Sequence, residues 1–274
     1  MPELTSDISQ SLLDAVDDLA QRTGDSRSAI VSHALADALG VDHASLFQVS
    51  AAGALVAGVT RGSITVAELV THGDFGLGTF DDLDGEMVVL DGTAYQVTKD
   101  GTTIADPAAH VPYGVVLNFH PDATAELEPF DSFDDLVREL DALRTTDNEF
   151  FAVRIDGTFD HVKTRAVCKA EGDSLVDAAS VQAKFEFDDI TGTMAGVWSP
   201  KYTQSITVAE WHLHFLTDDH QGGGHVLGGR GSGLQVQVQR VADFHVAFPE
   251  TAAFMTADLD ADHREALDSA ETDS

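Results

Sequence analysis

Apolar residues at helical spacing characterise the beginning of the chain. A first run consists of Leu12, Leu13, Val16, Leu19 and Ala20. A second run with similar spacing consists of Ile30, Val31, Ala34, Leu35 and Leu39. Between them, Gly24 can end one helix and Ser26 can cap the next, which Gly40 can end. The pattern predicts a helical pair that forms an N-terminal extension over residues 1–44.

The predicted helical pair, whose second helix opens with residues 26–30, resembles the helical part of ribbon-helix-helix repressors. Those repressors dimerise through such helices. The preceding residues 4–9 contain no Lys or Arg to contact DNA phosphates. We therefore interpret the pair as a docking or dimerising extension and not as a DNA-binding element.

From about residue 45 onward, short alternating or apolar runs are separated by turns that contain glycine. This pattern is typical of β-strands, and its clearest examples are residues 85–90, 115–119, 150–155 and 234–241. One helix is predicted over residues 132–143, with Ser132 as its cap. Its apolar stripe consists of Phe133, Leu136, Leu140 and Leu143. The predicted fold class is therefore α+β.

The composition is that of a globular protein, because 43% of the 274 residues are hydrophobic and can fill a substantial core. No run of about 18 apolar residues occurs, and residues 1–11 lack the features of a secretory signal. We therefore expect a cytoplasmic protein without a membrane partner. Cys168 is the only cysteine, which excludes an intrachain disulfide and a cysteine-based metal site.

Acidic side chains outnumber basic ones by 47 to 15, and the formal net charge is -32. This charge opposes binding to the phosphate backbone of nucleic acids. Because the acidic residues are spread along the whole chain, they indicate a host rich in salt. The acidic residues 258–274 are expected to form a solvated tail, with a short helix over residues 262–270 as the alternative.

The strongest chemical signal is the H-x-H motif of His212 and His214, near the end of a strand predicted from about residue 205. Residues two apart on a strand face the same side, so the two imidazoles converge together with Glu210. The glycine run at residues 222–224 then allows a tight return that brings His225 beside the pair. Three neutral nitrogen ligands would leave a position open on a zinc ion, as in a catalytic site.

This spacing alone is compatible with several proteins. The three histidines also suit a zinc hydratase of the carbonic anhydrase type, which is the main alternative function. A cupin would place a ligating Glu soon after H-x-H, where this chain has Thr217, Asp218 and Asp219. A metal-binding or sugar-binding module without catalysis is a further class, and a chance H-x-H on an exposed strand is the simplest alternative. Glu210 is a possible extra ligand, although a solvated carboxylate is more common.

Four separate stretches resemble acetolactate decarboxylases, in the same order along the chain. They are HGDFGLGTF leading to LDGEM (residues 72–80 and 83–87), FAVRIDG leading to VKTR (residues 151–157 and 162–165), residues 212–225, and Ala270 with Glu271. The resemblance covers roughly residues 46–271. It implies a mixed β-sheet domain over residues 45–165, a small antiparallel β-barrel domain over residues 166–274, and a metal between them. Such enzymes are usually dimers, so the resemblance implies a homodimer.

The resemblance also implies the site residues. The zinc (Zn2+) ligands fall on His212, His214 and His225. The remaining site residues are the carboxylates Glu86 and Glu271, the cationic Arg165 and the hydroxyl of Thr79. The implied reaction is the decarboxylation of acetolactate, a small-molecule substrate, to acetoin and CO2.

The implied chemistry needs no organic cofactor, because zinc can stabilise the electron pair that departing CO2 leaves behind. Arg165 suits the anionic end of the substrate, since its charge is permanent and its guanidinium can bind two oxygens. Glu86 is the first choice for the acid that protonates the product. Glu271 shares that role or acts as a base, and the sequence does not rank the two.

We predict that the protein needs high salt to stay folded. At molar salt the Debye length is about 3 Å, so the self-repulsion of the acidic surface is screened. The melting temperature should therefore rise between dilute buffer and molar KCl. An unchanged melting temperature would contradict the prediction.

Overall fold

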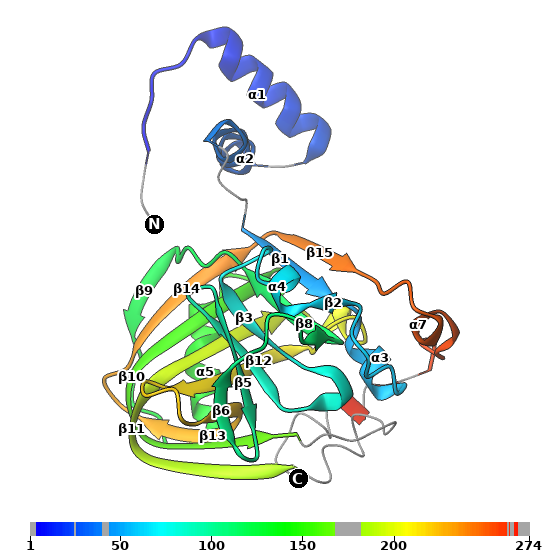
Figure 1. Ribbon diagram of the computed structural model, residues 1–274. Coiled ribbons are helices and arrows are strands. Elements are labelled where there is room, and N and C mark those ends of the chain that lie inside the picture. Colours follow the sequence, from blue (N-terminus) through cyan, green and yellow to red (C-terminus); the bar gives the residue numbers. More distant parts are fainter. Residues whose placement is uncertain are drawn as a thin grey trace.

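The computed structural model describes residues 4–24, 26–39, 44–167, 182–261, 263 and 266–267 (Figure 1). Two large β-sheets pack against each other, and a pair of helices lies apart from them. The predicted α+β class is confirmed. No helix within the described residues is long and apolar enough to cross a membrane.

Helices α1 (Gln10–Thr23) and α2 (Arg27–Leu39) form the predicted pair and contact each other (Figure 1). At the start of α2, Ser26 Oγ accepts a hydrogen bond from the N–H of Ala29, as expected for a cap. Gly24 ends α1 with a left-handed φ of 83°. Gly40, the predicted end of the second helix, lies outside the described residues. The docking or dimerising role stays a prediction.

The first sheet has seven strands and is mixed, as predicted. Its order is β15 (Asp243–Ala247), β1 (Ser45–Val49), β8 (Tyr113–Leu117), β3 (Phe75–Thr79), β4 (Glu86–Leu90), β5 (Thr93–Thr98) and β6 (Gly101–Ile104). Strand β15 is parallel to β1, and the other neighbours are antiparallel. Every residue of β3, β4 and β8 is buried, because apolar clusters cover both faces of the sheet.

The second sheet has six antiparallel strands. Its order is β11 (Ala183–Ser199), β12 (Glu210–Thr217), β13 (Gly223–Gly231), β10 (Phe150–Ala166), β14 (Gln235–Val241) and β9 (Ala123–Glu126). Strand β10 also pairs with β11. The pairings therefore run from β11 through β12, β13 and β10 and return to β11. The predicted helix is α5 (Phe133–Leu143), which Ser132 caps. Leu136 and Leu140 anchor α5 to this sheet within one apolar cluster.

Short elements connect these strands. They are α3 (Ala52–Val56), β2 (Ile64–Thr65), α4 (Val66–Leu69), β7 (His110–Val111), 3-10 helices at Asp81–Leu83 and Lys201–Thr203, and α7 (Ala252–Thr256). One core cluster contains Leu77 and Val88 of the first sheet together with Ala152 of the second. Packing between the two sheets therefore forms the centre of the molecule.

Two expectations differ from the structure. The strand that carries H-x-H begins at Glu210 and not near residue 205, because the Thr203 carbonyl accepts hydrogen bonds from Ile206 and Thr207 in a turn. The solvated-tail interpretation fails at Leu267, which is helical and 3% exposed, because this apolar side chain packs in the main core cluster. The C-terminal residues 268–274 lie outside the described part of the chain.

The chain crosses between the two sheets more than once. Strands β9 and β10 begin before residue 165 and belong to the six-stranded sheet, whereas β15 comes later and belongs to the seven-stranded sheet. The division into domains at residues 44 and 165 stays a prediction. Sheet membership, however, does not follow a single boundary at residue 165.

Candidate metal centre

His212 and His214 lie on one face of β12, as the H-x-H spacing predicts. Trp211 and Leu213, which alternate with the two histidines along the strand, are buried in the apolar cluster that also contains Leu136 of α5. Because these large apolar side chains occupy that core, the two histidines must face the opposite way, toward the seven-stranded sheet.

The turn after β12 brings His225 next to this pair. Strands β12 and β13 are antiparallel, and their register places His225 opposite His214. Two glycines permit the close pairing, since a β-carbon on Gly223 or Gly224 would lie 2.3 Å from a carbonyl oxygen of a neighbouring strand. Gly224 also has a φ of 124°, a conformation that favours glycine.

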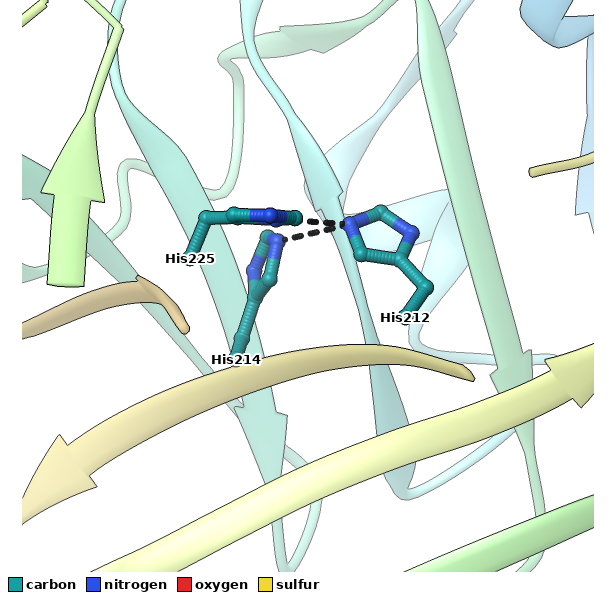
Figure 2. A group of neighbouring side chains, drawn as sticks. All are labelled: His212, His214 and His225. Atoms are coloured by element: carbon teal, nitrogen blue, oxygen red, sulfur yellow. Dashed lines mark hydrogen bonds between the residues drawn. The ribbon is translucent and has the colours of Figure 1, made fainter. Parts of the chain in front are cut away.

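The three imidazoles point their nitrogens toward one another (Figure 2). His212 Nε2 lies 3.1 Å from both His214 Nε2 and His225 Nδ1. Tetrahedral zinc–nitrogen bonds of about 2.0–2.1 Å would separate the ligand atoms by about 3.4 Å, so the spacing fits an ion of this size. Among the described residues, this is the only group of three or more His, Cys, Asp or Glu whose ligand atoms all lie within 4.8 Å.

A hydrogen bond to the other sheet orients His214. Its Nδ1 lies 2.7 Å from the carbonyl oxygen of Met87 on β4. A carbonyl only accepts, so Nδ1 must carry the proton, and Nε2 then presents a lone pair to the cluster. This is the usual way in which a metal-ligating histidine is held in one tautomer.

Burial keeps the imidazoles of His212 and His214 neutral. It lowers the pKa of His212 to about 3, and the nearby charge of Arg165 acts in the same direction. Burial is also the main cause that places the pKa of His214 well below its usual value, against the opposing effect of the hydrogen bond to Met87. Neutral imidazoles are the form that binds metals, so no proton has to be removed from these two side chains at pH 7.

The seven-stranded sheet presents a row of polar side chains to the histidines. Thr79 on β3 pairs with Glu86 on β4 and with Tyr113 on β8, so the three are neighbours across the sheet. All three line one cavity together with Arg165 and two of the histidines. The structure therefore brings together all the predicted site residues that it describes.

Arg165 extends the opposite wall of this cavity. It lies on β10 directly across from His225 on β13, so strand register places the cation next to the histidine cluster. Its side chain is buried, and Nη1 donates a hydrogen bond of 3.1 Å to Gln182 Oε1. The guanidinium is thus fixed inside the cavity instead of extending into solvent.

Glu86 is a buried carboxylate beside the histidine cluster. Its Oε1 accepts a hydrogen bond of 3.2 Å from the N–H of Val167, and its Oε2 lies 3.6 Å from His214 Nε2. The hydroxyl of Thr79 donates to the carbonyl oxygen of Gly85, at 2.7 Å, in the turn before Glu86. Thr79 therefore supports the backbone that presents this carboxylate.

One predicted carboxylate, Glu271, and one possible extra ligand, Glu210, are not part of this cavity as described. Glu271 lies outside the described residues, so its role stays a prediction. Glu210 is exposed and pairs with Lys201 at 3.1 Å, which identifies it as a solvated carboxylate.

Sequence reasoning missed Tyr113, Gln182 and the apolar residues Val208 and Leu267 of the cavity. The pairing of β3 with β8 would have indicated Tyr113, because this pairing places Tyr113 across from Thr79. That register depends on contacts between distant parts of the chain. No local pattern indicated it.

Three buried imidazoles, a guanidinium and a carboxylate around one cavity define a candidate metal-dependent enzyme. The sequence model of the alpha-acetolactate decarboxylase family matches residues 46–261. The alpha-acetolactate decarboxylase of Methanosarcina mazei is 38% identical over 82% of this chain and 80% of its own length. That of Bacillus licheniformis is 36% identical over 78% of this chain and 86% of its own length.

A solved structure gives the same result. The crystal structure of alpha-acetolactate decarboxylase from Bacillus subtilis strain 168 superposes with a TM-score of 0.80 and 31% identity, covering 84% of this chain and 100% of that one. This chain therefore belongs to the alpha-acetolactate decarboxylase family. The resemblance seen in the sequence, and the expectation of an enzyme of the carboxy-lyase class, are confirmed.

We predict that the metal-free protein loses stability as the pH falls from 7 to 5. The unfolded imidazoles take up protons below their ordinary pKa of about 6.5, whereas burial lowers the pKa of folded His212 to about 3 and places that of folded His214 well below its usual value. Each group therefore contributes stability that is present above pH 6.5 and is lost toward acid. Thermal melts in molar KCl after chelator treatment measure this. The double variant His212→Gln/His214→Gln should show a weaker decline, and an equal decline in both proteins would contradict the assignment.

Proposed function

We propose that this chain decarboxylates 2-acetolactate to acetoin and CO2 with a zinc ion held by His212, His214 and His225. The observation that carries the proposal is the convergence of these imidazoles with Arg165 and Glu86 in one buried cavity. Membership in the alpha-acetolactate decarboxylase family supports the choice of substrate.

The donor set suits zinc, because imidazole nitrogens are common zinc ligands and three of them leave a position for substrate. All three side chains are buried, so the ion would be shielded from bulk water. When bound there, zinc supplies a Lewis acid that withdraws negative charge from the oxygens of the substrate. Since none of the ligands is charged, they do not reduce that effect.

Arg165 binds the anionic substrate in this proposal. Its charge is permanent, and the contact with Gln182 holds the guanidinium in the cavity. The carboxylate of acetolactate would be paired there, next to the histidine cluster. Cleavage of the carbon–carbon bond then releases CO2 and leaves the electron pair on the substrate carbon, from which it delocalises into the adjacent ketone.

Glu86 provides the proton that completes the product. The carbon that loses CO2 must gain a proton, and a buried carboxyl group next to it can deliver one from a single side. The N–H of Val167 and the support from Thr79 to the preceding turn fix the direction of the Glu86 carboxyl group. The resemblance to the family assigns Glu271 as the second carboxylate, which shares this role or acts as a base on the substrate hydroxyl.

Removal of the metal tests the function directly. Dialysis against a chelator should abolish acetoin release from acetolactate, and added zinc should restore it, because the charge that delocalises into the ketone needs a Lewis acid to stabilise it. Acetoin is measured alongside CO2 hydration, the reaction of the alternative zinc hydratase. Full decarboxylase activity without bound metal, or CO2 hydration without acetoin, would contradict the proposal.

Substitution of Glu86 tests the acid. Glu86→Gln keeps the shape of the side chain but removes its ionisable group, so kcat should fall by about 100-fold or more while the zinc content is retained. Glu210→Gln is the matched control, because that carboxylate is exposed on the same strand as two ligands. Near-normal turnover of Glu86→Gln would remove this residue from the acid role.

A further inference from the structure

A second cavity adjoins the one that contains the histidines. Three residues line both, namely Val208, His225 and Leu267. The space beside the histidines is about 30 Å³, whereas the neighbouring groove has a volume of about 390 Å³. The two spaces are therefore separated by a thin wall and differ more than tenfold in size.

The neighbouring groove is largely apolar. Its walls include Phe133 and Val137 of α5, and Trp211, Leu213 and Val226 of the six-stranded sheet. These five side chains carry no charge and offer a surface that suits hydrocarbon. Gln204 and Glu210 also line the groove and make part of its surface polar. An alkyl chain that passed the wall would find room there.

Hydrogen bonds hold the wall in place. The N–H of Val208 points to Tyr113 Oη at 3.4 Å, and the same phenol oxygen lies 3.0 Å from Thr207 Oγ1. One residue earlier, the carbonyl oxygen of Ile206 accepts from Gln48 Nε2 at 2.7 Å and from the N–H of Ala52 at 2.9 Å. The segment that presents Val208 is therefore tied to β1, to the start of α3 and to β8.

This fixation matters for the substrate. Acetolactate carries a methyl group on the carbon that bears its hydroxyl and carboxylate, and homologous 2-hydroxy-3-oxo acids carry longer alkyl groups there. A mobile wall could yield to a longer group. A wall held by its backbone and backed by a buried tyrosine would limit the length of that group by steric overlap.

We propose that Val208 is a specificity-determining residue that limits the alkyl group of the substrate by closing the metal cavity against the apolar groove. The proposal rests on the proposed function, because it concerns the substrate range of that reaction. Tyr113 is a positioning residue in this arrangement, since it acts through Thr207 and the backbone of Val208.

The variant Val208→Ala tests the proposal by joining the two spaces. The values of kcat/KM are measured for acetolactate and for its 2-ethyl and 2-propyl homologues, with zinc-loaded full-length protein. One methylene in an apolar pocket changes selectivity by about 10-fold to 200-fold. The ratio of kcat/KM for the 2-propyl homologue to that for acetolactate should therefore rise by about tenfold or more in Val208→Ala.

Two further variants separate this effect from a general loosening of the core. Val238→Ala is the matched control, because Val238 is 7% exposed against 9% for Val208 and lines neither cavity. It should leave the ratio unchanged. Adding Val137→Phe to Val208→Ala fills the groove from the side of α5 and should lower the ratio again.

The outcomes distinguish this proposal from the proposed function. If wild-type protein releases acetoin but the ratio in Val208→Ala equals that of wild type, the assignment of Val208 is wrong and the proposed function stands. An equal rise in Val238→Ala, or no reversal by Val137→Phe, also overturns the assignment. If zinc-loaded wild-type protein turns over none of the three acids, the proposed function fails and this inference fails with it.

Discussion

The hydrogen bond between His214 Nδ1 and the carbonyl oxygen of Met87 joins the two sheets at the candidate metal centre. It connects a side chain of the six-stranded sheet to the backbone of the seven-stranded sheet, and it fixes which nitrogen faces the cluster. The ligand geometry therefore depends on how the sheets pack and not on β12 alone. The same packing places Glu86, the residue just before Met87, beside His214. One contact thus aligns a proposed metal ligand with the carboxylate proposed to deliver a proton.

Strand register arranges the rest of the cavity as two opposing rows. One row crosses β8, β3 and β4 with Tyr113, Thr79 and Glu86, and the other crosses β10, β13 and β12 with Arg165, His225 and His214. In each row, strand pairing makes neighbours of residues that are separated in sequence. The register of that pairing must be exact, because a slip of one residue would turn a side chain to the other face of its sheet. Rigid sheets on both sides explain how a small cavity can hold several polar groups at fixed positions. They also explain why a single valine on a well-anchored turn can limit its size.

Much of this arrangement could be predicted from local patterns. The helical pair, the cap at Ser132 and the convergence of His212 with His214 follow from spacing and capping chemistry, and the return to His225 follows from its glycines. The start of β12 could not, because the turn at Thr203 depends on hydrogen bonds that alternation does not reveal. Leu267 was hidden by its acidic neighbours, which favour a solvated tail, although its own burial decides the outcome. Glu86 and Arg165 entered only through the family resemblance, since nothing local connects them to the histidines.

The parallel pairing of β1 with β15 has a consequence for how the protein comes to exist in the cell. Ser45 lies next to Asp243, so the edge of the seven-stranded sheet is completed by a segment that the ribosome makes long after β1. Contacts of such wide sequence separation slow folding, and domains fold as units once their segments are available. Strand β1 also holds the turn that carries Val208, through Gln48. The nascent chain must therefore extend past β15 before the sheet that carries Thr79 and Glu86 has its full set of strands.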